Sequence, residues 1–166
     1  PIDSWYLDMG LLIKYWGSER SYHHTAPVSS IYALREAMLL IHEEGLENGF
    51  SRHALNYTAF KAGIDAMGLS FFVEEPYRAP MINPILAPEG IDEAKLRGRL
   101  LQDYGIEVGG GLGALKGKAF RVGLMGQCSQ KDHVMLLLGA LEQVLLAEGH
   151  QVQASGVSAA AIVYKS

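Results

Sequence analysis

The chain has 166 residues, of which 49% are hydrophobic, enough for one core of ordinary size. Its 14 basic and 18 acidic residues are spread along the sequence and give a formal net charge of −4. No basic stripe is present that could neutralise a run of nucleic-acid phosphates. The longest apolar runs are far shorter than the roughly 20 residues needed to cross a bilayer. We therefore expect neither nucleic acid nor a membrane among its partners.

A single cysteine, Cys128, excludes an internal disulfide and is typical of a reducing compartment. Residues 1–20 do not resemble a signal peptide, because Asp3, Asp8 and Lys14 interrupt any apolar core. We therefore expect a cytoplasmic protein or one of an organelle matrix.

The first part of the sequence indicates helices. An aromatic and apolar segment from Ser4 to Trp16 has helical spacing and is followed by a glycine. After a polar loop, Pro27 suits the first turn of a helix whose apolar residues recur on one face until Gly45. A second amphipathic helix follows directly and closes at Gly68.

The pattern then becomes extended. Strands are predicted over 69–73, 81–87, 106–108 and 119–124, and Pro84 favours a sheet edge or a bulge in the second of them. This order of elements predicts an α/β fold of the α+β type: a small, mostly antiparallel sheet with helices on one face.

Two further helices are predicted among the strands. One begins at the capping residue Asp92 and ends at Gly105, and a longer one begins with Ser129 as its cap. The tail from Gln151 fits either a closing helix or frayed chain.

Residues 22–27, Tyr-His-His-Thr-Ala-Pro, precede a predicted helix. Free backbone N–H groups and the positive end of the helix dipole favour anions at such a place, and Tyr22 and Thr25 add hydroxyl donors. The alternative is that Thr25 only caps the helix and the histidines are solvated. Adjacent histidines point in different directions, so we predict no metal site here.

The glycine-rich stretch 109–118 matches neither common nucleotide motif. A Walker loop requires glycine and a hydroxyl residue where Leu112 and Ala119 stand, and Lys116 replaces the third glycine of the dinucleotide pattern. Two interpretations remain: a flexible turn that lets the backbone approach a ligand or a neighbouring subunit, and a plain hairpin connection.

Arg121 lies inside an otherwise apolar strand. A guanidinium is costly there unless it is paired, and its planar fork suits a carboxylate, so the sequence leaves a structural salt bridge and a ligand-binding arginine as alternatives. Ser129-Gln130-Lys131 is similar to a cofactor-lysine tripeptide, but its place at a helix start indicates an exposed Lys131. Cys128 has no nearby base, and we expect a buried or half-buried thiol rather than a nucleophile.

Two groups of motifs, taken together and in this order, resemble the class V, fold-type-I aminotransferases similar to serine–pyruvate and alanine–glyoxylate aminotransferase. The first group comprises residues 4–8, 22–27, 34–37 and 44–47, and the second comprises 106–108, 110–113, 117–118 and 120–126. The matches span most of the chain up to about residue 148.

The resemblance implies pyridoxal 5'-phosphate as cofactor, a homodimer, and small amino-acid and 2-oxo-acid substrates. In the family, the residues matching Tyr22 and Thr25 reach the cofactor phosphate of the neighbouring subunit, and the arginine matching Arg121 binds the substrate carboxylate. Residues 1–45 would be the end of the large cofactor-binding domain with its exit helix, and 46–166 the small carboxy-terminal domain.

The family's cofactor lysine lies before the point matching Pro1, and none of the chain's lysines stands in its motif. We therefore expect a carboxy-terminal portion that contains no catalytic residue and is inactive alone. The complete enzyme would move an amino group from serine or alanine to glyoxylate or pyruvate. The alternatives are a non-catalytic dimerisation or ligand-binding domain, and a relative of the cysteine desulfurases with Cys128 as nucleophile.

Overall fold

The computed structural model describes residues 4–165. The chain divides into two compact units, Pro1–Glu44 and Gly45–Ser166, one residue before the predicted boundary. The assignment of the first unit to a large cofactor domain stays a prediction. None of the helices in the described part is long and apolar enough to cross a membrane.

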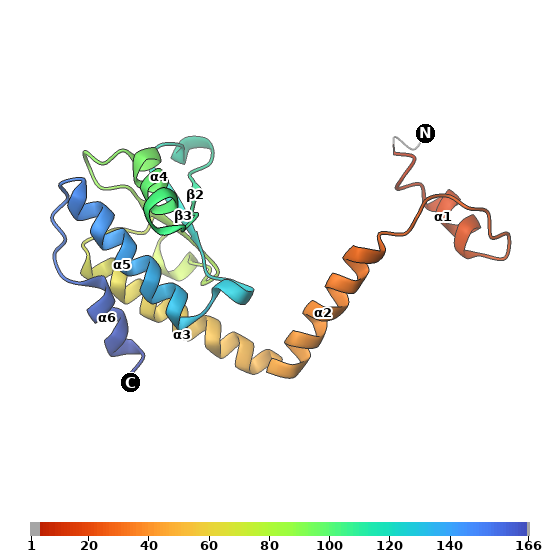
Figure 1. Ribbon diagram of the computed structural model, residues 1–166, viewed down its shortest axis with the longest axis horizontal. Helices are drawn as coiled ribbons and strands as arrows, with labels where there is room; N and C mark the ends of the chain where they lie inside the picture. Colours follow the sequence, from red (N-terminus) through yellow and green to blue (C-terminus); the bar gives the residue numbers. More distant parts are fainter. Residues whose placement is uncertain (1–3, 166) are drawn as a thin grey trace. The chain divides into compact units, whose positions relative to one another are not determined.

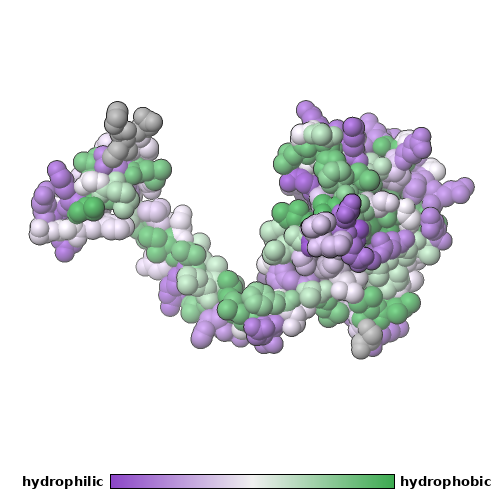
Figure 2. Space-filling view, turned by 180° about the vertical axis from the view of Figure 1, so that it is seen from behind, coloured by the Kyte–Doolittle hydropathy of each residue, from purple (hydrophilic) through white to green (hydrophobic). Residues whose placement is uncertain are grey.

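Within residues 4–44, the first unit contains two helices and no buried hydrophobic residue. Helix α1, Met9–Trp16, begins where the Asp8 carboxylate accepts hydrogen bonds from the backbone N–H groups of Gly10 and Leu11. Helix α2, Val28–Glu44, has no buried residue, although apolar side chains occur along its length (Figure 2). Its exposed large apolar residues include Val28, Ile31, Leu34, Met38 and Ile41. A helix with so much apolar surface requires a covering surface.

The second unit contains the sheet, four α-helices and three short 3₁₀ turns within the described residues. The α-helices are α3 (Leu46–Ala66), α4 (Glu93–Tyr104), α5 (Lys131–Ala147) and α6 (Gly156–Val163). The strands are β1 (Ile82–Leu86), β2 (Gly109–Gly110) and β3 (Ala119–Gly123). The 3₁₀ turns are η1 (Glu75–Tyr77), η2 (Gly113–Leu115) and η3 (Gly126–Cys128).

The sheet has the order β1-β3-β2, and both pairings are antiparallel. Successive side chains of a strand point to opposite faces. On β3, Phe120 and Val122 are buried in the core, whereas Arg121 between them points to the other face and is half-buried. The core face is covered by helices, of which α3 and α5 lie side by side (Figure 1). The predicted fold, a mostly antiparallel sheet with helices on one face, is confirmed.

The local signals at Asp92, Gly105 and Gly45 are confirmed. The Asp92 carboxylate accepts from the backbone N–H groups of Ala94 and Lys95, and Gly105 ends α4 in the left-handed conformation with φ 68°. Gly45 has a φ of 81° and separates α2 from α3. The tail forms helix α6, capped by the Ser155 hydroxyl, which decides between the two interpretations of that segment.

Two predicted strands were wrong in extent. Residues 69–73 contribute one isolated bridge, between Phe71 and Ile85, rather than a strand. The strand predicted at 106–108 begins instead at Gly109. The reason is local: the backbone N–H of Ile106 still donates to the Leu100 carbonyl at the end of α4, so this residue belongs to the helix terminus.

The predicted cap of α5 was also wrong. Gln130 occupies the cap position, while Ser129 is fully buried. The Ser129 carbonyl accepts hydrogen bonds from Arg52 Nη1 at 2.6 Å and from Asn56 Nδ2 at 2.8 Å, both on α3. Ser129 is therefore engaged in tertiary contacts with α3 and does not cap α5, as its position in the sequence had predicted it would.

Candidate functional site

The Arg121 guanidinium is hydrogen-bonded through Nε, whereas its two Nη groups are available to a ligand. Its Nε donates a hydrogen bond to the Gly110 carbonyl across the sheet, at 2.7 Å. Within residues 4–165, neither of its Nη groups has a hydrogen-bond or ion-pair partner. The structural salt bridge considered from the sequence is therefore absent from the described part. A guanidinium fixed through Nε with both Nη groups available matches the two oxygens of a carboxylate.

The strand opposite Arg121 consists of two glycines, and each leaves room for one arginine. Gly109 pairs with Arg121 in the sheet, and a Cβ atom at Gly109 would lie 3.1 Å from Arg121 Nη2. A Cβ atom at Gly110 would lie 3.2 Å from Nη2 of Arg97, a residue of α4. Larger residues in β2 would therefore push against a guanidinium group.

The two arginines differ in charge compensation. Arg97 forms an ion pair with Glu93, one turn earlier on α4, and the Glu93 side chain is only 3% exposed. Sequence reasoning missed this pair, although the four-residue spacing of opposite charges on a predicted helix was a visible signal. Since Glu93 already compensates Arg97, Arg121 is the one of these two guanidinium groups that is available to an added anion.

The glycine-rich stretch joins β2 to β3 as a hairpin. This is the hairpin connection that was one of the two interpretations left open by the sequence. A Cβ atom at Gly111 would lie 2.1 Å from the Leu115 carbonyl oxygen, so the loop closes only with glycine at this position. Whether it also approaches a ligand stays a prediction.

Tyr22 and Thr25 lie together in the loop before α2. The Tyr22 hydroxyl and the Thr25 hydroxyl are 2.8 Å apart, and both residues are exposed. In the described part of the chain, the Thr25 hydroxyl is bonded to Tyr22 and not to an N–H of α2, so Thr25 does not act as the helix cap. Two neighbouring hydroxyls can both donate to one anionic group.

The histidines of this loop are packed among aromatic rings, contrary to the alternative of solvated side chains. The ring of His23, which is 8% exposed, lies 4.3 Å from that of Trp5, and His24 stacks on Tyr6 at 4.2 Å between centroids. These contacts connect the segment before α1 to the loop that carries Tyr22 and Thr25. Within residues 4–165, no group of three or more His, Cys, Asp or Glu side chains could hold a metal ion.

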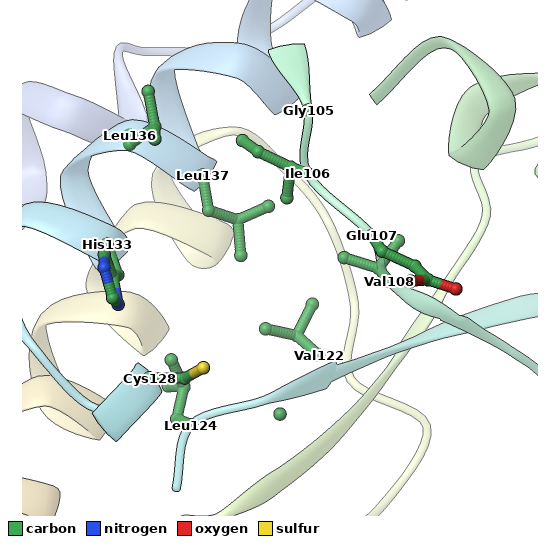
Figure 3. Close-up of a pocket in the computed structure, with 11 residues that line it drawn as sticks. Gly105, Ile106, Glu107, Val108, Val122, Leu124, Cys128, His133, Leu136 and Leu137 are labelled. Carbon is green, nitrogen blue, oxygen red and sulfur yellow. The ribbon is translucent and has the colours of Figure 1, made fainter. Parts of the chain in front are cut away.

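A cavity of about 320 Å³ lies on the helix-covered side of the sheet. Ile106, Val122 and Leu137 face its interior, and the Glu107 carboxylate points away (Figure 3). Cys128 lines this cavity and is exposed, so the prediction of a buried or half-buried thiol was wrong. The reason is that the chain leaves the sheet at the end of β3, and the following turn η3 places Cys128 on the surface.

Several solved aminotransferases have a part that is similar in structure to this chain. A ureidoglycine–glyoxylate aminotransferase from Bacillus subtilis superimposes with a TM-score of 0.92 at 40% identity, over 100% of this chain and 43% of that one. An alanine–glyoxylate aminotransferase from Nostoc sp. gives 0.80 at 53% identity, over 87% of this chain and 38% of that one. A pyridoxamine–pyruvate aminotransferase from Mesorhizobium loti superimposes with a TM-score of 0.86 at 32% identity, over 99% of this chain and 42% of that one. The chain therefore has the fold of one part of these aminotransferases.

The comparison of sequences agrees. The (S)-ureidoglycine–glyoxylate transaminase of Bacillus subtilis (strain 168) is 40% identical over 167 residues, which cover all of this chain and 40% of that protein. No protein-family model matches the chain. The chain is a homologue of the glyoxylate aminotransferases of class V and corresponds to their carboxy-terminal part. It spans about two fifths of the length of the relatives it matches.

Proposed function

We propose that the chain is the carboxy-terminal part of a pyridoxal-phosphate-dependent aminotransferase that moves an amino group from a small amino acid, serine or alanine, to glyoxylate or pyruvate. The support is the homology to enzymes named for glyoxylate and pyruvate acceptors. The expected location in a reducing compartment, the cytoplasm or an organelle matrix, remains part of this proposal.

The observation that carries the proposal is the state of Arg121. Its Nε is occupied by the Gly110 carbonyl, and both Nη groups are available among the described residues. Amino donor and oxo-acid acceptor carry the same carboxylate next to the reacting carbon. One arginine with a fixed planar fork can therefore bind and orient both substrates in turn, which reduces the entropic cost of each half-reaction.

Tyr22 and Thr25 fit the phosphate of the cofactor. Their hydroxyls are 2.8 Å apart and exposed, and both can turn their protons outward to donate to phosphate oxygens. When bound, pyridoxal phosphate supplies the electron sink for amino transfer, and the protein supplies binding and orientation. By analogy with the family, these hydroxyls serve the neighbouring subunit of a homodimer. The open apolar surface of α2 agrees with a helix that another surface covers.

Cysteine desulfurase chemistry is a weaker proposal, even though Cys128 is exposed. The thiol lines the cavity on the helix-covered side of the sheet, together with Val122 and Leu124. Arg121 points from the opposite face, because it alternates with Val122 along β3. A nucleophilic thiol and the carboxylate-binding group would therefore lie on different sides of the strand.

The replacement Arg121→Lys in the full-length enzyme tests the proposal. Lysine keeps the charge but cannot make the paired planar contact, so we expect kcat/KM to fall for donor and acceptor alike. The fall should be roughly 10- to 1000-fold if about 1.5 to 4 kcal/mol of transition-state binding is lost. The absorbance of the bound cofactor should be unchanged, since Arg121 is assigned to substrate and not to phosphate.

Arg78→Lys is the matched control. Arg78 also donates from Nε to a carbonyl, that of Val73, at 2.7 Å, but its guanidinium lies over the ring of Phe71. This control should keep the wild-type kcat/KM. A folded Arg121→Lys enzyme with wild-type kcat/KM for both substrates would reduce Arg121 to a structural residue and leave the non-catalytic binding domain as the better interpretation.

A further inference from the structure

We propose that the Glu93–Arg97 ion pair of α4 positions the guanidinium of Arg121 by fixing the peptide of Gly110. Arg97 and Glu93 are thus positioning residues for carboxylate binding. This inference rests on the proposed function, because it concerns the arginine assigned to the substrate carboxylate.

Strand β2 cannot hold itself in place through side chains. It consists of Gly109 and Gly110 alone and lies at one edge of the sheet, with β3 as its hydrogen-bonded neighbour. Glycine loses more conformational freedom on ordering than any other residue, and an edge strand has a hydrogen-bonded neighbour on one side only. The position of β2 therefore depends on groups that pack against its two faces.

Both faces of β2 are covered by guanidinium groups. A Cβ atom at Gly110 would lie 3.2, 3.3 and 3.4 Å from Nη2, Cζ and Nε of Arg97. Three nearly equal distances to coplanar atoms mean that the Arg97 guanidinium lies flat against this residue. The corresponding distances from a Cβ atom at Gly109 to Nη2, Cζ and Nε of Arg121 are 3.1, 3.4 and 3.5 Å. Because adjacent residues of a strand face opposite sides, the two arginines enclose β2 from both faces.

The ion pair fixes Arg97 on the helix-covered side. Its Nε donates to Glu93 Oε1, and Nη2 lies 3.5 Å from Oε2 of the same carboxylate. The Glu93 side chain is 3% exposed and that of Arg97 31% exposed, so this pair is shielded far better than an ordinary surface pair. Arg97 therefore presents a fixed planar surface to Gly110.

Gly110 transmits this position to Arg121 through its carbonyl. The carbonyl accepts the hydrogen bond from Arg121 Nε at 2.7 Å, which is the contact that sets the direction of the fork. If Arg97 is removed, the Gly110 peptide loses its support on one face. The acceptor of Arg121 then becomes mobile, and the two Nη groups lose their fixed orientation.

The experiment compares three variants of the full-length enzyme. Arg97→Met removes the planar surface and the ion pair, Arg97→Lys keeps a partner for Glu93 without the planar surface, and Asp103→Asn is the control. Asp103 pairs with Arg99 at the same four-residue spacing on α4, while Arg99 retains Glu148. We expect both Arg97 variants to raise KM for donor and acceptor by about tenfold, the size typical of an effect transmitted through a neighbouring group. The Asp103→Asn enzyme should keep its KM, and the cofactor absorbance should not change in any variant.

A double-mutant cycle separates positioning from general stability. In the Arg121→Lys background, Arg97→Lys should no longer change KM, because its effect passes through the Arg121 fork. An undiminished effect in that background, or an unchanged KM in the Arg97→Lys enzyme, would overturn the positioning role. If Arg121→Lys itself leaves KM and kcat unchanged, the proposed function fails instead, so the two failures are distinguishable. If Arg97→Met does not fold, the Arg97→Lys cycle decides alone.

Discussion

The Nη2 atom of Arg121 lies close to Gly109 across the sheet, because a Cβ atom at Gly109 would be only 3.1 Å from it. The close approach joins two features that the sequence shows separately, an arginine in an apolar strand and a run of glycines. Gly109 is thus part of the arginine site rather than only part of a turn.

Gly109→Ala should disturb this site without unfolding the protein. The added methyl group meets the far end of a side chain whose Nε is tethered to Gly110, so the guanidinium must turn away from its present plane. In the full-length enzyme we expect KM for both carboxylate substrates to rise by about 3- to 30-fold, equivalent to roughly 0.5 to 2 kcal/mol.

Gly98→Ala is the control for this prediction. Gly98 lies inside α4, and a Cβ atom there meets nothing within 4 Å. Alanine should therefore stabilise the helix by about 0.5 to 1 kcal/mol, measured by denaturant unfolding, and leave KM unchanged. Equal effects of the two substitutions on KM would contradict the specific role of Gly109.

Thr25→Ala should weaken cofactor retention. The change removes one of the two hydroxyls assigned to the cofactor phosphate, and a lost charge-assisted hydrogen bond costs about 1 to 3 kcal/mol. Equilibrium dialysis of the full-length enzyme measures the loss, and Thr25→Ser should restore binding. In a mixed dimer of wild-type and Thr25→Ala subunits, the defect should appear in the partner's site. A defect confined to the mutated subunit's own site would disprove the cross-subunit role.

The 166-residue chain alone should not attach pyridoxal phosphate covalently. None of its lysines stands in the family's cofactor motif. After addition of cofactor and removal of the excess, the visible spectrum should show no stoichiometric band, and borohydride treatment should label no single lysine. A trapped adduct on one lysine would refute this expectation.

Glu148→Gln should lower stability in a pH-dependent manner. Hydrogen bonds from Lys95 and from Arg99 lower the pKa of the Glu148 carboxyl in the folded protein below its ordinary value of 4.5. A lowered folded-state pKa means that the carboxylate stabilises the fold fully above pH 4.5, and that this contribution is lost as the pH falls through the lower pKa. The melting temperature of Glu148→Gln should therefore lie below that of the wild type at pH 7, and the difference should vanish at low pH. A difference that persists at low pH would assign the effect to packing.

His53→Phe should loosen the turn η3. His53 Nδ1 lies 2.6 Å from the Gly49 carbonyl, and its Nε2 accepts from the Gly126 N–H at 3.0 Å. Both contacts are satisfied together only by a neutral ring with its proton on Nδ1. Hydrogen exchange at Gly126 should accelerate by about 5- to 10-fold, equivalent to roughly 1 kcal/mol. Thr58→Val, on the same helix, should not change it, and ring-nitrogen chemical shifts that place the proton on Nε2 would contradict the contact.

The sequence predicted what depends on neighbouring residues. The beginning and end of α4 followed from Asp92 and Gly105, since a cap is formed within one turn of the chain. The order of elements was enough to predict the antiparallel sheet, and the order and spacing of the motifs were enough to recognise the family. The roles assigned to Tyr22, Thr25 and Arg121 remain predictions.

Tertiary structure decided what depends on distant residues. The strand predicted at 106–108 moved to Gly109, because the α4 terminus still occupies Ile106. Ser129 became a buried acceptor for α3 because Arg52 and Asn56 approach it from more than seventy residues away. The support of Gly110 by Arg97 likewise arises only when α4 packs on the sheet. Periodicity and capping act over a few residues, whereas the partner of each polar group depends on which surfaces meet in the folded chain.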